Sequence, residues 1–143
     1  MEKSLFYILK RRYGNVCEVY RVVGKVKDRK TGISTDIKDR IPLNRVIISP
    51  TRLYINTNFK STFKMGDKEL LVWKGEALPK DFVPNENDYF VIKNEIYNII
   101  EMVEEESNGY WIHVRKMQKQ LASRILEMPL KEQLSSEMEI NNE

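Results

Sequence analysis

Hydrophobic residues recur along the chain first at helical spacing and then in the runs and alternations that are typical of strands. Leu5 and Ile8 fall on one face of a helix predicted over residues 3–13. From Asn15 onward the chain becomes rich in Val and Tyr, which favour strands. The pattern therefore predicts a short N-terminal helix followed by a mainly β domain.

Two long β segments follow this helix. Residues 16–28 form the first predicted strand, with Gly24 as a bulge or a point of close approach. Residues 41–55 contain the second, whose apolar centre is 46–48. The polar stretch at 28–40 contains a turn cluster and lacks periodicity, so it is predicted to be a mobile loop.

The clearest unit is a three-stranded antiparallel meander over residues 89–117. Residues 89–92 and 96–99 would pair across a tight turn. Asn108 and Gly109 carry the signature of a two-residue turn into the third strand. The sequence thus predicts that one wall of the domain is a rigid meander.

A turn centred on Asn108 and Gly109 would fix the register of the last two strands of the meander. The opposed pairs would be Val103 with Val114, Glu101 with Lys116 and Glu104 with His113. One apolar pair and two charge-compatible pairs support this register. His113, the only histidine, is accordingly interpreted as a strand-surface residue and not as a catalytic base.

The C-terminal part is predicted to be a helix and an arm. Residues 118–128 place Leu121 and Ile125 on one stripe of a helix, and the polar, acidic residues after it favour a flexible tail. We therefore expect one β-barrel domain over 1–117, with the N-terminal helix and the loop, and a helix with a flexible acidic arm over 118–143. The fold class is mainly β, a small antiparallel barrel or sandwich.

Composition and charge place the chain among globular proteins that have interaction surfaces. The chain has 143 residues, 41% hydrophobic and 31% charged, and no apolar run is long enough to span a bilayer. Residues 1–52 carry a net charge of +8 and residues 53–143 a net charge of −5, which sum to the +3 of the whole chain. A basic half and an acidic half favour contacts with nucleic acid, with partners or with other copies.

The residues offer little for catalysis, metal binding or cofactor binding. The single cysteine, Cys17, lies between valines and is interpreted as a buried strand residue. The sequence contains no phosphate-binding glycine loop, dinucleotide fingerprint or serine elbow. Glu104, Glu105 and Glu106 alternate between the two faces of a strand, so they are interpreted as a solvated hairpin end and not as metal ligands. We expect no enzyme, metal or cofactor.

A nucleic-acid-binding β-barrel, of the OB or SH3 type, remains the alternative. Arg21, Lys25 and Lys27 lie on a strand with Tyr20 nearby, and single-strand-binding barrels combine basic and aromatic residues in this way. Any half-solvated strand can produce the same pattern, and no ribonucleoprotein aromatic motif is present. The two interpretations therefore stay open on these residues.

The order of the segments adds a resemblance to a known family. The strand "VYRVVGKVKDRKTG", the polar loop, the strand "RVIISP" and the final "FVPNENDYFVIKNEIYNIIEMVEEESNGYWIHV" follow one another over residues 16–117. In this order the chain resembles the small head–tail connector proteins of tailed bacteriophages, the head-closure (stopper) and adaptor proteins beneath the portal.

The resemblance implies a structural virion protein that joins head to tail and helps close the DNA channel. It implies a homo-oligomeric ring of six or twelve copies, with portal or adaptor and tail proteins as partners and non-specific contact with packaged DNA. The expected location is the neck of the virion, after synthesis in the cytoplasm of the bacterial host. The N-terminus, with its positive charges after the apolar run, is the reverse of a secretory signal, and no membrane partner is expected.

Two sets of residues are candidates for these roles. The channel-loop candidates are Asp28, Arg29, Lys30, Thr31, Gly32, Asp36, Lys38, Asp39 and Arg40. The interface candidates are Leu5, Ile8, Trp73, Trp111, Leu121 and Ile125. The two tryptophans are flanked by apolar residues on strands and are interpreted as core or interface anchors.

Overall fold

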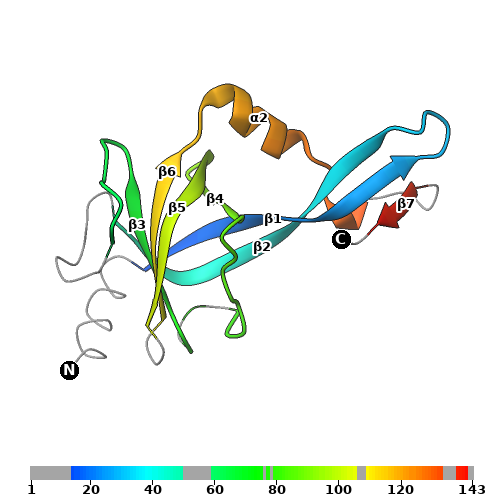
Figure 1. Ribbon diagram of the computed structural model, residues 1–143. Coiled ribbons are helices and arrows are strands. Elements are labelled where there is room, and N and C mark those ends of the chain that lie inside the picture. Colours follow the sequence, from blue (N-terminus) through cyan, green and yellow to red (C-terminus); the bar gives the residue numbers. More distant parts are fainter. Residues whose placement is uncertain are drawn as a thin grey trace.

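The computed structural model describes residues 14–49, 59–75, 77, 79–105, 109–133 and 138–141 (Figure 1). Its elements are β1 (Gly14–Asp28), β2 (Ser34–Ser49), β3 (Lys68–Trp73), β4 (Tyr89–Ile92), β5 (Glu95–Glu105), β6 (Gly109–Lys116), helix α2 (Lys119–Glu127), the 3-10 helix η1 (Lys131–Gln133) and β7 (Met138–Asn141). The helix predicted over residues 3–13, with Leu5 and Ile8, lies outside the described residues.

Strand pairing within the described residues closes into a ring. The strands pair in the order β2-β3-β6-β5-β4-β1, and β1 pairs again with β2. All of these pairings are antiparallel. The prediction of a mainly β antiparallel fold with a helix near the C-terminus is therefore confirmed, and the sheet itself is ring-like.

Alternating side chains of the central strands fill two apolar clusters on opposite faces of the sheet. The inner cluster takes residues from all six strands of the ring, among them Val19, Leu43, Val72, Phe90, Tyr97 and Ile112. The outer cluster joins Ile47, Leu71, Trp73 and Trp111, with Phe59 and Val103 packed against it. Full burial of a Val, Leu, Ile or Phe side chain stabilises a fold by about 1.5–3 kcal/mol, so both faces contribute to stability.

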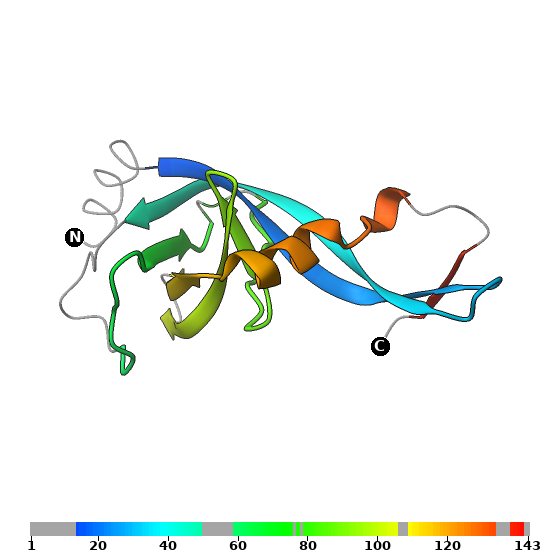
Figure 2. The same ribbon diagram turned by 90° about the horizontal axis from the view of Figure 1, so that it is seen from above.

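β1 and β2 extend well beyond the ring as a two-stranded ribbon (Figure 2). Their ladder runs from Gly14 with Ile47 at the ring to Lys27 with Ser34 near the tip. The mobile loop predicted for 28–40 is therefore wrong for residues 34–40, which belong to β2. They form a strand because β1 supplies the hydrogen-bonding partner, although their polar sequence shows no period.

Two irregularities bend the ribbon. The register shifts between Asn15 and Cys17, where Arg45 of the opposite strand has a φ of 60°, and again between Val22 and Gly24. The second shift confirms the bulge predicted at Gly24. An extra residue in one strand bends that strand and increases its twist, so the ribbon can leave the ring at an angle.

The predicted hairpin of β4 and β5 is confirmed, but its turn is one residue shorter than predicted and the register differs by one residue. Ile92 lies opposite Glu95, and the turn residues Lys93 and Asn94 have φ values of 50° and 66°. Positive φ at both central residues is the requirement of a type I′ turn, whose twist matches that of the flanking strands. Glu95, which the prediction left in the turn, therefore belongs to β5, and Ile96 lies opposite Val91.

The register predicted for β5 and β6 is wrong by three residues. Val103 lies opposite Trp111, and Glu104 lies opposite Tyr110. Gly109 belongs to β6 and is not a turn residue. At this position β3 approaches the backbone of β6 closely. A Cβ at this position would lie 2.2 Å from the carbonyl oxygen of Val72. The glycine is thus required by packing against the neighbouring strand.

The C-terminal segment is more ordered than predicted. The predicted helix is confirmed as α2, and it lies over the point where the ribbon leaves the ring (Figures 1 and 2). After η1, residues 138–141 pair with residues 25–28 of β1 as strand β7. The prediction of a flexible arm over the whole tail is therefore wrong for these residues, because the edge of β1 offers them unpaired backbone groups.

Candidate functional site

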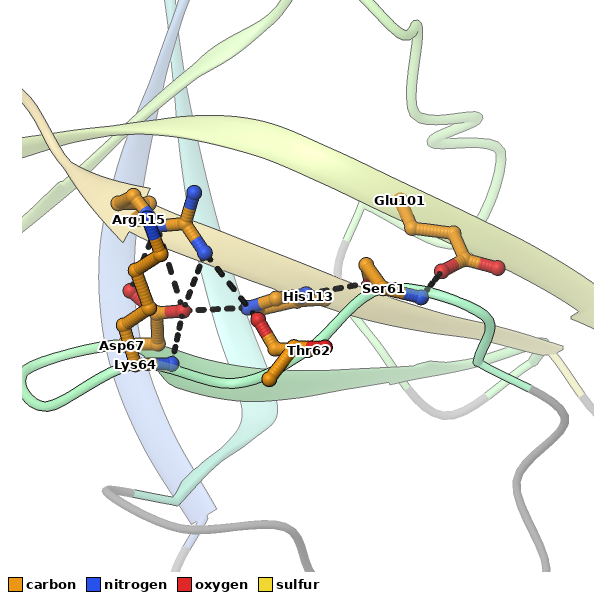
Figure 3. Close-up of polar contacts among 7 residues, drawn as sticks. All are labelled: Ser61, Thr62, Lys64, Asp67, Glu101, His113 and Arg115. Carbon is orange, nitrogen blue, oxygen red and sulfur yellow. Dashed lines mark hydrogen bonds and ion pairs between the residues drawn. The ribbon is translucent and has the colours of Figure 1, made fainter.

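A network of polar side chains lies on the outer face of the sheet, where residues 59–67 cross β5 and β6 (Figure 3). His113 of β6, at its centre, is fully buried. Its Nε2 lies 2.6 Å from Asp67 Oδ2, and its Nδ1 lies 2.7 Å from Ser61 Oγ. Because a carboxylate only accepts, Nε2–H donates to Asp67. Nδ1 and Ser61 Oγ form the second hydrogen bond of the ring.

Asp67 receives hydrogen bonds from several directions. Arg115 donates from Nε to Oδ1 and from Nη2 to Oδ2, both at 3.0 Å, and the backbone N–H of Lys64 donates at 2.8 Å. Burial opposes ionisation of this carboxyl, but the hydrogen bonds from Arg115, Lys64 and His113 outweigh it and hold the pKa of Asp67 well below its usual range. Asp67 is therefore a buried, ionised anchor.

Glu101 of β5 holds the other end of the crossing segment. Its carboxylate accepts hydrogen bonds from the backbone N–H groups of Lys60, at 2.9 Å, and Ser61, at 2.7 Å. Burial again opposes ionisation, but the Ser61 hydroxyl and these two N–H groups lower the pKa of Glu101. Residues 59–67 are thus tied to β5 at one end and to β6 at the other.

Ser61, His113 and Asp67 follow the order of nucleophile, base and acid found in serine hydrolases. Access is the obstacle, because Phe63 stacks on the His113 ring with centroids 3.7 Å apart and planes 9° apart. The backbone N–H groups that could bind an oxyanion at Ser61 already donate to Glu101. A substrate would have to displace both Phe63 and Glu101, so this geometry favours attachment of the loop over catalysis.

The sequence placed His113 incorrectly and did not single out its partners. His113 lies opposite Glu101 in a buried position, whereas the prediction placed it on the surface opposite Glu104. No local signal identifies Ser61, because its contact with His113 spans 52 residues of sequence.

The structure separates the channel-loop candidates into two groups. Asp28 ends β1 and accepts a hydrogen bond from the backbone N–H of Lys30 at 2.9 Å, and residues 29–32 form the exposed tip. The remaining candidates, Asp36, Lys38, Asp39 and Arg40, lie in β2. Only the tip therefore has the place in the fold that the prediction requires.

Lys38 is a buried part of the junction between the ribbon and α2. Its side chain is 3% exposed, and its Nζ donates to the carbonyl oxygens of Ile125, at 2.8 Å, and Leu126, at 3.0 Å. It also lies 3.9 Å from the centre of the Tyr20 ring. A cation at the C-terminal end of a helix satisfies the last carbonyls and interacts favourably with the helix dipole. Lys38 thus holds the helix on the ribbon.

The interface candidates within the described residues are mostly buried in the chain itself. Trp73 and Trp111 belong to the outer cluster, and Ile125 is the buried residue of α2. Leu121 is 45% exposed and remains available to a partner. Of the two interpretations of Trp73 and Trp111, as core or as interface anchors, their burial in the outer cluster favours the core.

Arg21, one of the basic residues considered for nucleic-acid binding, has a structural partner. Its guanidinium donates two hydrogen bonds to Asp88, at 2.8 and 2.7 Å, and one to the carbonyl oxygen of Val83 at 2.8 Å. This pairing raises the pKa of Arg21. The contact fixes the loop before β4 against β1, so Arg21 is not a free cation of the ribbon surface.

Together these features define a small, mainly β protein with a ring-like sheet, a projecting ribbon and a buried polar network. No family model, curated protein or solved structure matches the chain. No group of three or more His, Cys, Asp or Glu side chains is placed to hold a metal ion within the described residues. The helices of that same part of the chain are too short or too polar to cross a membrane.

Proposed function

We propose that this chain is a structural subunit of a tailed-phage virion, a head–tail connector that assembles into a ring beneath the portal. The observation that carries this proposal is the ribbon of β1 and β2, which projects far beyond the ring-like sheet (Figure 2). A rigid ribbon of this kind reaches a neighbouring subunit or the central channel. The resemblance of residues 16–117 to the connector family supports the same role.

The geometry of the polar network adds to the proposal that the chain is not an enzyme. His113 is buried under Phe63, and the network fixes residues 59–67 on the sheet. A subunit that transmits load between head and tail needs a covered, rigid outer face, and it needs no substrate pocket there. We therefore assign the network a structural role.

The tip of the ribbon is the part that would contact packaged DNA. Arg29 and Lys30 are exposed there, next to Ile33, which is 63% exposed. Two cations at the end of a rigid arm attract phosphate groups without reading sequence. The channel-loop role thus applies to residues 29–32 and not to the whole of 28–40.

Electron microscopy of the purified full chain, alone and with the portal protein encoded beside it, tests the connector proposal. We expect ring-shaped oligomers or a stable complex with the portal. Exclusively monomeric protein under both conditions would refute the proposal. Genes for portal, capsid and tail proteins should also lie next to the gene for this chain.

A charge reversal at the tip tests the contact with DNA. Particles carrying Arg29→Glu with Lys30→Glu should assemble but lose packaged DNA, because the tip would repel phosphate groups. Lys80→Glu with Lys93→Glu, exposed in the loop before β4 and in the β4–β5 turn, is the matched control with the same change in charge. Equal DNA retention in both double variants would exclude the channel role of the tip.

Nucleic-acid binding as the main activity remains a second candidate, favoured by one observation. Lys25, Lys27, Arg29 and Lys30 are all exposed on the outer half of the ribbon. If this surface binds oligonucleotides on its own, log K should fall steeply and linearly with log salt, by about 0.7–0.9 for each phosphate contact. Binding that persists without portal or ring formation would favour this second function.

A further inference from the structure

The outer half of β1 has an edge, on the side away from β2, that the other strands of the ring leave uncovered. On that side β4 pairs only with residues 18–20, and β7 pairs with residues 25–28. Among the described residues, no other strand pairs with this edge. An exposed strand edge presents a row of backbone donors and acceptors that accepts any extended segment. The ribbon therefore carries a strand-docking site outside the ring.

β7 is attached to this site separately from the rest of the fold. The chain is fixed near β2 by a hydrogen bond from the backbone N–H of Lys38 to the carbonyl oxygen of Pro129 at 3.1 Å, and by a parallel bridge from Lys38 to Leu130. Within the described residues, the strand pairing of β7 is with β1 alone. β7 is thus held on β1 by a ladder of backbone hydrogen bonds.

Charge also favours this pairing. The outer half of the ribbon exposes Lys25, Lys27, Arg29 and Lys30. Residues 134–143 contain three glutamates and no lysine or arginine. The positive charge of the ribbon attracts the acidic C-terminal segment. This attraction is the same whether the segment belongs to the same chain or to another.

We propose that, in the assembled protein, the strand Met138–Asn141 of one copy docks on β1 of the neighbouring copy, in the register that β7 adopts here. This inference rests on the proposed ring assembly and names its contact. The same backbone ladder forms in both cases, so exchange costs little beyond ordering the donor segment. The partner is therefore a second copy of this chain.

The chain length between the two attachment points sets the geometry of the exchange. Five residue steps separate Gln133 from Met138, which span about 17 Å when fully extended. The acceptor ribbon must lie within that reach of the donor Gln133. Donor and acceptor sites lie on different elements, so a copy can give its strand to one neighbour and accept a strand from the other. Contacts of this head-to-tail kind generate rings when the rotation closes.

Cysteine pairing between two differently marked chains tests the exchange. Lys27 lies directly opposite Glu139, and opposed residues of an antiparallel pair have Cα atoms about 4.5–5.5 Å apart, within the range of a disulfide. Full-length Lys27→Cys and Glu139→Cys chains are mixed in denaturant, refolded together and oxidised. The native Cys17 is buried, and burial followed by the charge of Glu18 raises its pKa to about 12, so it reacts slowly.

We expect a disulfide-linked pair of chains at twice the mass of one chain, which is lost on reduction. Lys93→Cys mixed with Glu139→Cys is the matched control, because Lys93 is exposed on the ring at the β4–β5 turn. This control should give at least tenfold less linked pair. Linked pairs no more abundant than in the control would overturn the exchange, whether or not a single chain carrying both substitutions closes its own disulfide.

Electron microscopy of the same oxidised samples separates this inference from the proposed function. Rings without linked chains would leave the connector proposal standing and overturn the exchange. Linked chains without rings or portal binding would keep the exchange and remove the connector proposal. A chain ending at Gln133 supplies an independent readout, because it should remain folded but fail to form the oligomer.

Discussion

Replacing Asp67 with alanine removes the anchor of the polar network on the outer face. Three groups lose their acceptor at once: the His113 ring, the Arg115 guanidinium and the backbone N–H of Lys64. The His113 ring is fully buried and cannot turn to water. We therefore expect Asp67→Ala to destabilise the fold and to release residues 59–67 from the sheet.

The size of the effect follows from burial. Removing one partner of a buried ion pair costs about 3–5 kcal/mol. Arg115 has a side chain that is 31% exposed and can be rehydrated, so we expect about 3 kcal/mol. With an unfolding entropy of about 2.1 cal/mol/K per residue, this loss lowers the Tm of a chain of 143 residues by about 10 °C.

Thermal unfolding followed by circular dichroism measures this loss. Glu132→Ala is the control, because Glu132 is 68% exposed and its ion pair with Arg40 is 3.9 Å long. Removing such a pair should change stability by less than about 1 kcal/mol. A fall in Tm for Asp67→Ala no larger than that for Glu132→Ala would refute the reasoning that the network holds the outer face together.

The pH dependence of Asp67→Asn gives a second test of the same residue. The pKa of Asp67 is lower in the folded chain than its unfolded value of about 3.9. A depressed pKa adds stability above the unfolded value, and the contribution is lost as the pH falls toward the folded value. The advantage of Asp67 over asparagine should thus be constant from pH 7 to about 5 and shrink below about pH 4. A difference that stays constant down to pH 3 would contradict an ionised Asp67.

Two further substitutions test the packing of the ring and the ribbon. Gly109→Ala should cost about 3 kcal/mol in urea unfolding, because its Cβ would overlap the Val72 carbonyl, whereas Gly75→Ala, with φ 81° and open space, should cost about 1 kcal/mol. Equal costs would contradict the close approach of β3. Lys38→Met should cost about 1–2 kcal/mol and reduce the helical signal, because two carbonyls at the end of α2 lose their donor. An unchanged helical signal would contradict that role.

The hairpin of β4 and β5 was predictable because its information is local. Each strand reads as a β run, and Lys93 and Asn94 can adopt the turn between them. The register of β5 and β6 was not predictable in the same way. Asn108 and Gly109 look like a turn, but the glycine is required by contact with Val72, which is distant in sequence. The reason for a glycine can thus be a contact with a residue far along the chain, which the neighbouring sequence does not indicate.

The ribbon and the polar network depend on partners far along the chain. Residues 34–40 look like a loop because both polar and apolar positions lack a period, yet β1 gives them a complete ladder. Ser61 reaches His113 across 52 residues. Phe63 of the crossing segment covers the His113 ring. Nothing in the sequence around His113 indicates that this residue is covered. Strand pairing and side-chain contacts between residues far apart along the chain leave no local pattern in the sequence.

The bulge between Val22 and Gly24 connects the packing of the ring with the surface offered by the ribbon. In the ring, Cys17 and Val19 of β1 point into the inner cluster. Without an extra residue, strict alternation would carry Lys25 and Lys27 onto that same face. The register shift places Val26 there instead, where it is 3% exposed, and turns the two lysines to the other face. One inserted residue therefore gives the outer ribbon a covered face and a basic face, next to the edge that accepts β7.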